Sequence, residues 1–549
     1  MNRVLENRYY YLDNFEMVLR WVEQRYSDLL LDTERDFIGN FSMLPRASRA
    51  LLVRMIMRKG TLFRSSKLHY DEIGGAVEAA QALIEQRWLD DRPPLTLEQL
   101  FTLLTKAELG CVFDSALPDK NARKADQLQS LKDRYTELQP YDAWYCGATD
   151  HVYELLVMPV CECLRLMFFG NLRQDWSEFV LADLGLYAYE KVEFPATSRI
   201  FQNRQDIADY LHLHHCRERL RSGTDAGLVQ TDIPSDPYQN EWLEQRRAKL
   251  LFQIARHYEK DKDWARAHAL YSQCAYSGAR SRAVRVLERS EQFEPALQLA
   301  LAAQQQPESE AEQQQMGRIV PRLLCKLGHP PVPRASAVPI AKLTLTLPEP
   351  SLSMAVEELV QSHFQQALSP VYYVENTLAN ALFGLLCWRA IFAPLPGAFF
   401  HPYQSAPADL HSADFYRRRQ ELFRSCLAQL DSGEYTQTIA QNFRNKAGIR
   451  SDFVAWEILS HEILDQALAC IPALHLKKWF ERILLDIPSN RSGFPDLIQF
   501  WPREKRYRMI EVKGPGDRLQ DNQLRWFDYC AKHDMPVAVC YVRWAEDAA

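Results

Sequence analysis

Near the C-terminal end of the chain, charged residues stand inside two apolar runs where ordinary strands would carry hydrophobic residues. The runs, FPDLIQFW and YRMIEVKG, are joined by a short charged turn, and their composition predicts the two strands of an antiparallel hairpin. Cross-strand neighbours in such a hairpin lie about 5 Å apart. Asp496, near the start of one strand, is therefore expected to face Glu511 and Lys513, near the end of the other.

The Glu-x-Lys spacing places both charged side chains on one side of the sheet. Side chains alternate along a strand, so Glu511 and Lys513 share a face while Val512 packs into the other. Two buried carboxylates repel each other without a cation, and hard oxygen ligands select Mg²⁺ or Mn²⁺. The lysine is expected to orient or activate the attacking water, or to stabilise the pentacovalent phosphate. The alternative is a structural ion pair on a solvated strand.

The spacing matches the PD-(D/E)xK nuclease superfamily. Pro495 and Asp496 are followed, after residues 497–510, by Glu511-Val512-Lys513. The glycines and proline at 514–516 end the second strand, and Gln523 lies on a predicted helix, QDNQLRWFDYCAKH, as a supporting site residue. With a last predicted strand, PVAVCYV, this part of the chain is expected to form an α/β nuclease domain.

A more specific resemblance extends upstream of the hairpin. The segments RSGFPDLIQFW and EVKGPGDRLQDNQLRWFDY resemble a VRR-NUC domain, and VENTLANALFGLLCWRAIF resembles the matching segment of the Fanconi-associated nuclease family. The resemblance implies a structure-specific DNA nuclease that cuts 5′ flaps in interstrand crosslink repair, with 5′-3′ exonuclease character. It also implies that Glu375 is a further metal ligand, delivered from a helix, and that the backbone carbonyl of Val512 completes the shell.

Competing interpretations exist for two of the candidate metal-binding segments. A glutamate that precedes a buried helix, as Glu375 does, also serves as an N-terminal dipole partner. Glu457, in WEILSHEIL, is the rival candidate for the additional ligand. The run HLHHC at 212–216 has no second ligand cluster, so a partly exposed helical segment is expected there instead of a metal site.

Outside the C-terminal domain the periodicity is mainly helical. Apolar residues repeat at three and four positions from residue 1 to about 235, and helices resume after 352. Four domains are predicted: a helical N-terminal region (1–90), a SAP-like DNA-binding domain (91–238), a tetratricopeptide-like domain (239–395) and a VRR-NUC nuclease domain (396–549).

The two middle assignments rest on short motifs. PPLTLEQLFTLLTKAELG has Thr96 and Glu98 as a capping start, which resembles a SAP module or an ordinary helical hairpin. EKDKDWARA and ERSEQFEPA repeat a Glu, an aromatic residue and an Ala, as tetratricopeptide repeats do.

Three further segments carry simpler expectations. The polar run at 303–315 is expected to be loose, and the proline-rich segment at 329–350 is expected to be a connector. DFVAWEILSHEILDQALAC is expected to be one helix.

Contacts with DNA need local basic surfaces, because the net charge of −6 neither supports nor excludes a nucleic-acid partner. Arg282, Arg285 and Arg289 follow helical spacing along one face, which either holds phosphate by bidentate pairing or is simply solvated. A second candidate DNA-binding group consists of Arg246, Arg247 and Lys249.

The remaining features exclude several classes of protein. No apolar stretch suits a signal peptide or membrane span, which predicts a cytoplasmic, nucleoid-associated protein without a membrane partner. The 12 cysteines are scattered singly, so neither a disulfide framework nor a zinc ribbon is indicated. No obligatory protein partner is inferred from the sequence. Two alternatives to a flap nuclease stay open: a non-catalytic DNA-binding scaffold built on helical repeats, and a resolvase for four-way junctions.

Overall fold

The computed structural model describes residues 7–114, 116–117, 119, 121–146, 149–174, 176, 187–331, 340–348 and 354–545. The chain divides into two compact units. One comprises residues 1–187 and 201–207, and the other comprises residues 188–200 and 208–549. The four ranges expected from the sequence stay predictions.

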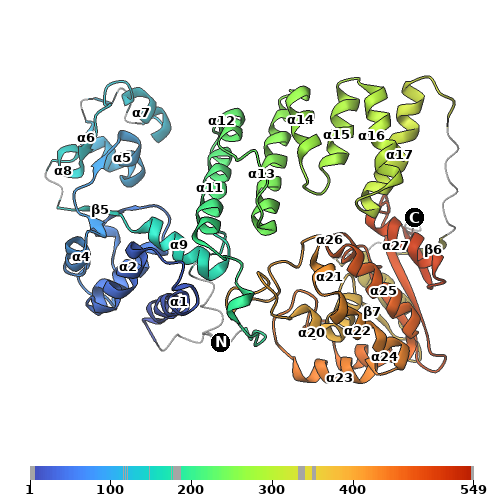
Figure 1. Ribbon diagram of the computed structural model, residues 1–549. Helices are drawn as coiled ribbons and strands as arrows, with labels where there is room; N and C mark the ends of the chain where they lie inside the picture. Colours follow the sequence, from blue (N-terminus) through green and yellow to red (C-terminus); the bar gives the residue numbers. More distant parts are fainter. Residues whose placement is uncertain are drawn as a thin grey trace. The chain divides into compact units, whose positions relative to one another are not determined.

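The first unit is mainly helical, as expected (Figure 1). Its longer helices are α1 (Tyr10–Tyr26), α2 (Asp32–Met43), α3 (Arg46–Ile56), α4 (Ala76–Glu85) and α9 (Met158–Phe169). A small antiparallel sheet joins β1 (Leu62–Arg64), β5 (Val152–Leu155) and β2 (Leu89–Asp90), in that order. The helical pattern expected from residue 1 to about 235 is therefore wrong at residues 152–155, which form the central strand.

The segment from 94 to 144 forms short helices on a core of its own. Its elements are β3 (Pro94–Leu95), α5 (Leu97–Leu103), α6 (Lys106–Val112), α7 (Lys124–Leu131), β4 (Gln139–Pro140) and α8 (Tyr141–Trp144). The capping start at Thr96 is confirmed, but its partner is Gln99, not Glu98: the two residues exchange side-chain and backbone hydrogen bonds of 2.8 and 3.1 Å.

The faint sequence repeat corresponds to a repeat in structure. Successive helices pack against one another in chain order (Figure 1). They are α13 (Glu241–Lys260), α14 (Trp264–Gln273), α15 (Ala279–Arg289), α16 (Phe293–Gln305) and α17 (Glu310–Lys326). Lys262 and Glu291 occupy the same left-handed turn position, with φ of 63° and 61°, and Ala267 and Ala296 are fully buried in the helices that follow. The array also contacts the C-terminal region through α17.

Two expectations about irregular segments are wrong. The polar run at 303–315 is helical except at 306–309: it contains the end of α16 and the start of α17, which Ser309 caps by accepting a hydrogen bond from the backbone N–H of Glu312 at 3.1 Å. The expected connector at 329–350 contains β6 (Ala341–Leu347), in which threonine and leucine alternate. Residues 332–339 and 349–350 of that segment lie outside the described residues.

The site-bearing sheet has five strands in the order β6-β10-β9-β8-β7. Its remaining strands are β7 (Val371–Tyr373), β8 (Leu497–Trp501), β9 (Arg506–Lys513) and β10 (Val537–Trp544). The predicted antiparallel hairpin of β8 and β9 is confirmed, and α27 (Asp521–Lys532) connects β9 to the parallel strand β10. The sheet takes β6 and β7 from before residue 396, where the sequence placed the start of the nuclease domain.

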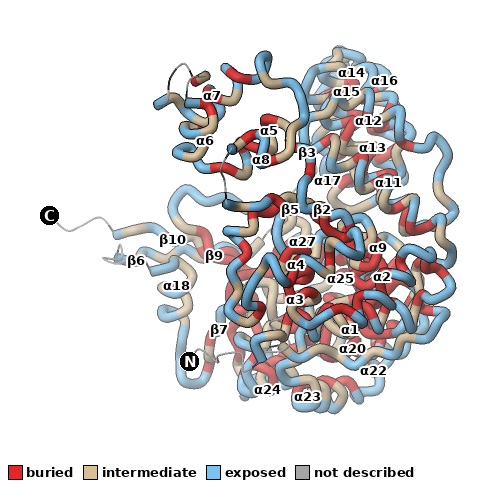
Figure 2. Tube along the Cα trace, turned by 90° about the vertical axis from the view of Figure 1, so that its left-hand side faces the viewer, coloured by how far each residue is buried: buried red, intermediate tan, exposed pale blue. Residues whose placement is uncertain are grey.

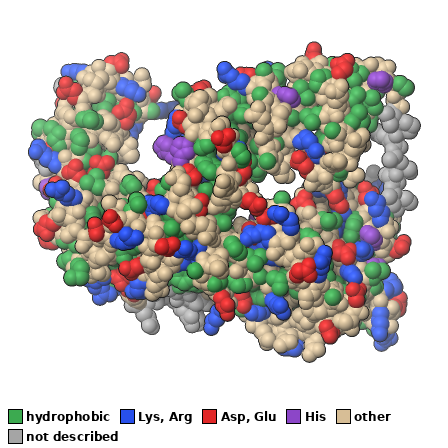
Figure 3. All heavy atoms as spheres, viewed as in Figure 1, with side chains coloured by type: hydrophobic (Ala, Val, Ile, Leu, Met, Phe, Trp, Pro, Cys, Tyr) green, Lys and Arg blue, Asp and Glu red, His purple; other side chains and the backbone are tan. Residues whose placement is uncertain are grey.

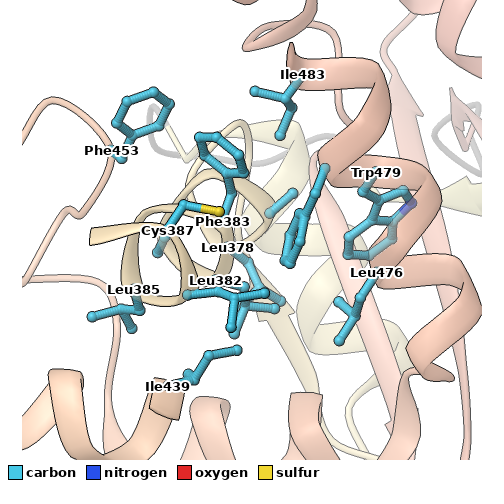
Figure 4. Close-up of a cluster of buried hydrophobic side chains, with 14 of the residues drawn as sticks. Leu378, Leu382, Phe383, Leu385, Cys387, Ile439, Phe453, Leu476, Trp479 and Ile483 are labelled. Atoms are coloured by element: carbon cyan, nitrogen blue, oxygen red, sulfur yellow. The ribbon is translucent and has the colours of Figure 1, made fainter. Parts of the chain in front are cut away.

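The apolar segment that follows Glu375, expected to form a buried helix, lies at the centre of the C-terminal core. It folds into α19 (Leu378–Leu386) and α20 (Trp388–Ile391). Phe383 packs against Phe453 and Phe480 at ring-centroid distances of 5.0 and 5.7 Å. Figure 4 shows its neighbours from α23 (Tyr435–Asn445) and α25 (Ala473–Leu485) converging on the same cluster.

Further helices complete the second unit: α11 (Arg204–Arg221), which starts in the first unit, α12 (Ala226–Thr231), α18 (Val356–Phe364), α21 (Phe415–Arg418), α22 (Gln420–Ser432), α24 (His461–Cys470) and α26 (Ile487–Asn490). The helix expected over 452–470 begins only at His461, where Ser460 caps it, and turns precede it. Among the described residues, no helix combines the length and apolar character needed to cross a bilayer.

The packing of this core predicts that two substitutions lower the free energy of unfolding by different amounts. Phe383→Ala should lower the free energy of unfolding by about 3–5 kcal/mol, because it leaves a cavity among packed aromatic rings. Leu474→Ala, at a position 63% exposed on α25, should change it by less than about 0.5 kcal/mol. Denaturant titrations of the two variants measure this difference, and equal small losses would contradict the assignment of the core.

Candidate active site

The hairpin register brings the predicted carboxylates together. Leu497 pairs with Ile510, so Asp496 and Glu511 are adjacent positions on neighbouring strands. The backbone N–H of Val512 donates a hydrogen bond to Asp496 Oδ2 at 2.7 Å. Asp496 is 7% exposed and Glu511 is fully buried, and Figure 2 shows β9 buried along most of its length. The charged groups therefore lie inside the sheet and not on a solvated face.

Two donors hold one oxygen of Glu511. Lys513 Nζ lies 2.8 Å from Glu511 Oε1, and the side-chain amide of Gln523, on α27, donates to the same oxygen. The other oxygen, Oε2, is buried and has no hydrogen-bond partner in the described structure. A buried carboxylate oxygen without a partner is costly unless a proton or a cation satisfies it.

The electrostatics of the pair reflect burial and repulsion. Burial, followed by the charge of Asp496, raises the pKa of Glu511 to about 8. Burial likewise raises the pKa of Asp496 to about 6, against the hydrogen bond from Val512, and the nearby carboxylates Glu375 and Glu357 add to the rise. For Lys513, burial opposes the ammonium, but the hydrogen bond to Glu511 raises its pKa overall. Two neighbouring carboxylates of this kind attract a cation.

Glu375 lies in a turn and not on a helix, which corrects the sequence-based expectation. The turn joins β7 to α19, because Asn376 adopts a left-handed conformation with φ of 52°. The backbone N–H of Val374 donates to the carbonyl of Asp496 at 2.8 Å, which extends the pairing of β7 with β8 to the residue before Glu375. Glu457, the rival candidate, is exposed in a different turn.

The donor set suits a hard divalent cation. Asp496, Glu511 and Glu375 offer only carboxylate oxygens, and Glu511 Oε2 is buried without a partner. In the described part of the chain, however, no three His, Cys, Asp or Glu side chains converge closely enough to form a metal-binding group. The chemistry of the donors therefore fits a hard divalent cation, with Asp496 and Glu511 as the central pair and Glu375 at its rim.

Sequence reasoning missed two side chains beside this site. Tyr373 donates a hydrogen bond from its hydroxyl to Glu375 Oε2 at 2.5 Å. Tyr373 could have been identified from the sequence by its position two residues before Glu375. Glu357, on α18, contributes to the raised pKa of Asp496. Nothing in the sequence connects Glu357 with residues so distant along the chain.

The first arginine group lies along an open groove of about 1550 Å³ within the second unit. Arg282 and Arg285 flank Glu259 at 3.5 and 3.6 Å. Arg289 is exposed, and no described acidic side chain lies within salt-bridge distance of it. The lining of the groove also includes Tyr416 and the segment 484–490, which shortly precedes the Pro-Asp motif.

The second arginine group has a mainly structural role, which corrects one of its predicted DNA contacts. Arg247 is buried, pairs with Glu244 at 2.8 Å and donates to the carbonyl of Pro234, so it is not available to DNA. Arg246 stacks on Trp242, with the guanidinium 3.3 Å from the ring centroid. Lys249 is exposed on the same helix. On the face shown in Figure 3, charged side chains of both signs are interspersed.

Three family models match this chain. A helix-turn-helix model described as "FAN1, HTH domain" matches residues 9–90. A "Fanconi anemia-associated nuclease SAP domain" matches residues 94–144, and a "VRR-NUC domain" matches residues 431–544. The last range contains the whole hairpin with its carboxylates and lysine.

Relatives and solved structures extend the similarity over the full chain. The chain is 54% identical to a Fanconi-associated nuclease 1 homolog of Pseudomonas aeruginosa, over 99% of this chain and 97% of the relative. Human Fanconi-associated nuclease 1 is 22% identical, and the match covers 97% of this chain but 62% of that relative. A crystal structure of paFAN1 bound to 2nt 5′flap DNA with gap superposes with a TM-score of 0.93 at 54% identity, covering 99% of this chain and 100% of that chain. A second, with 1nt 5′flap DNA, gives a TM-score of 0.91.

The buried carboxylates predict a pH-dependent stability in metal-free buffer. The pKa of Glu511 is about 8 in the folded protein and about 4.3 in an unfolded chain. Between these values the folded protein binds a proton that the unfolded chain does not, so stability should fall as pH rises through this window. Glu511→Gln should flatten that fall and stabilise the protein by roughly 1–3 kcal/mol at pH 8.

Denaturant unfolding in EDTA at several pH values measures this effect. Glu504→Gln is the matched control, because Glu504 lies exposed in the turn of the same hairpin. Part of the pH dependence should persist in Glu511→Gln, since the pKa of Asp496 is also raised, to about 6. An unchanged dependence of the unfolding free energy on pH in Glu511→Gln would show that ionisation of Glu511 does not destabilise the folded protein.

Proposed function

This chain belongs to the Fanconi-associated nuclease family and is a structure-specific DNA nuclease; we propose that it cleaves 5′-flap and related branched DNA in a reaction that requires Mg²⁺ or Mn²⁺. We further propose 5′-3′ exonuclease character and a role in repair of interstrand crosslinks at the nucleoid. The observation that carries the metal dependence is the buried pair Asp496 and Glu511, with one carboxylate oxygen left without a partner.

Each site residue has a separate proposed task. Asp496, Glu511 and the backbone carbonyl of Val512, with Glu375 at the rim, would hold the cation, which when bound supplies charge stabilisation at the phosphate. Lys513 is oriented by Glu511 at 2.8 Å, and its ammonium would position the attacking water or neutralise the developing negative charge. Gln523 fixes the orientation of Glu511 by donating to the oxygen that Lys513 also contacts.

Recognition of the DNA would use the groove outside the hairpin. Among the described residues, the acidic side chain within salt-bridge distance of Arg282 and Arg285 is Glu259, at 3.5 and 3.6 Å, so their planar donor sets remain available for bidentate phosphate pairing. With Arg289 they would anchor a DNA phosphate, and a 5′-terminal phosphate suits such a cluster. An anchor at a fixed distance from the hairpin would act as a ruler for the cut position.

The function is tested by removing the two strand carboxylates. Asp496→Ala and Glu511→Ala should each reduce flap cleavage by about a thousandfold or more, because each loses a metal ligand and its transition-state stabilisation. Binding of the flap should be largely retained, since the helical regions are untouched. Labelled 5′-flap, 3′-flap, four-way junction and linear duplex DNA, incubated with Mg²⁺, Mn²⁺ or EDTA, provide the measurement.

The same substrates separate this proposal from its alternatives. Glu504→Ala, in the exposed turn of the hairpin, should retain full activity and serves as the control. No cleavage of any substrate by the unmodified protein would indicate a non-catalytic scaffold, and a preference for four-way junctions would indicate a resolvase. Normal turnover in a correctly folded Asp496→Ala or Glu511→Ala variant would refute the site assignment.

The proposed anchor predicts a change in affinity and in cut position. Arg282→Gln combined with Arg285→Gln should weaken binding of 5′-phosphorylated flaps and reduce the salt dependence by about one unit of slope per lost phosphate contact. The products should become heterogeneous in length while the metal affinity stays unchanged.

Arg256→Gln combined with Arg266→Gln removes the same charge from neighbouring helices, at positions that do not line the groove, and serves as the matched control. Binding titrations and nucleotide-resolution product maps are compared on flaps with and without a 5′ phosphate. Identical affinities and cut positions for the Arg282/Arg285 variant and the unmodified protein would place the anchor elsewhere.

A further inference from the structure

Tyr373 occupies an unusual position at the rim of the candidate active site. It is the last residue of β7, the edge strand next to β8, and it pairs with Leu497, the residue after Asp496. Its side chain is 42% exposed, although it is a large aromatic residue at the end of a strand. Packing of the ring into the core therefore does not explain its presence there.

The hydroxyl of Tyr373 is directed at the carboxylate of Glu375. It donates to Glu375 Oε2 at 2.5 Å, which is a short, charge-assisted hydrogen bond. The hydrogen bond and burial raise the pKa of Tyr373, and the charges of Glu375, Asp496 and Glu357 add to the rise. A phenol is protonated at neutral pH, and the geometry shows that of Tyr373 acting as a donor to Glu375.

Glu375 has a second, weaker restraint within its turn. Its other oxygen, Oε1, accepts a hydrogen bond from the side-chain amide of Asn376 at 3.2 Å. Asn376 is itself held, because its side-chain oxygen accepts from the backbone N–H of Phe494 at 3.1 Å. A glutamate in an exposed turn would otherwise sample many rotamers, and ordering them on metal binding costs conformational entropy.

The neighbouring residue on the same strand provides an internal comparison. Tyr372 points to the opposite face of β7, as strand alternation requires, and its hydroxyl donates to Glu462 at 2.7 Å. The two tyrosines therefore make equivalent hydrogen bonds to glutamates, but only that of Tyr373 involves a candidate metal ligand. Glu462 lies on α24, outside the set of carboxylates around Asp496.

We propose that Tyr373 is a positioning residue for the divalent-cation site, and that its hydroxyl holds Glu375 at the rim of the pair formed by Asp496 and Glu511. The third carboxylate is then set in place before the cation arrives. Partners that orient a ligand in this way typically contribute 10- to 100-fold to metal affinity or activity. The inference rests on the proposed metal-dependent function, and it adds a residue that the nuclease motif does not contain.

The test measures metal binding without DNA or turnover. Mn²⁺ is titrated calorimetrically into the metal-free, full-length protein and its variants. Tyr373→Phe, which removes only the hydroxyl, should weaken Mn²⁺ binding about tenfold, whereas Tyr372→Phe should bind as the unmodified protein does. In a Glu375→Gln background, Tyr373→Phe should cause no further loss, because the two residues act as one unit. Flap cleavage by Tyr373→Phe should recover as Mn²⁺ is raised.

The outcomes separate this inference from the function on which it rests. If the unmodified protein binds no Mn²⁺, the metal dependence and the role of Tyr373 are both wrong. If it binds Mn²⁺ and Tyr373→Phe binds equally well, with an unchanged circular dichroism spectrum, only the role of Tyr373 is wrong. An equal loss in the Glu375→Gln background would also overturn that role, since Tyr373 would then act independently of Glu375.

Discussion

The burial of two carboxylates on facing strands is the constraint on which the rest of the site depends. Asp496 and Glu511 lie where water hardly reaches them, and burial raises the pKa of both. The charge of Asp496 adds to the rise for Glu511, and the charges of Glu375 and Glu357 add to the rise for Asp496. Such a pair persists only when fixed donors offset part of its cost. The N–H of Val512 serves Asp496, and Lys513 with Gln523 serves one oxygen of Glu511. In the proposed function, the remaining oxygen of Glu511, which is buried without a partner, is the one offered to a cation.

This local arrangement extends into the helical repeats through α27. Gln523 lies near the start of that helix, two residues after Asp521, which Arg318 of α17 contacts at 2.7 Å. Arg482 of α25, almost fully buried, pairs with Glu310 of α17 at 2.6 Å. The exposed pair of Arg318 and Asp521 contributes little stability on its own. Its effect is geometric, because it ties α27, which carries Gln523, to α17 of the array, and Arg482 links α25 to the same helix.

The parts of the molecule that could be predicted from the sequence are those with a local signal, either charges inside an apolar strand or a repeated motif. Asp496, Glu511 and Lys513 were found because charges stood inside apolar strands, and their burial follows from the hairpin register. The tetratricopeptide-like repeat was found from a Glu, an aromatic residue and an Ala that recur in two segments, and the structure places a left-handed turn at the same position of both. Features that depend on tertiary contacts were missed or misplaced. The burial of Arg247 follows from carbonyls of a preceding loop, and β6 acquires its strand conformation only by pairing with β10.

The position of Glu375 shows most clearly what could not be predicted from the sequence. The helix after Glu375 was predicted correctly, but the left-handed residue Asn376 keeps Glu375 itself in the preceding turn.

The most direct test of the proposed metal site is an anomalous diffraction map of the protein crystallised with Mn²⁺. The account predicts a peak roughly 2.0–2.3 Å from carboxylate oxygens of Asp496 and Glu511 and from the carbonyl oxygen of Val512, with Glu375 turned toward it. The absence of a peak at the hairpin under saturating Mn²⁺, or a peak held by other residues, would contradict it.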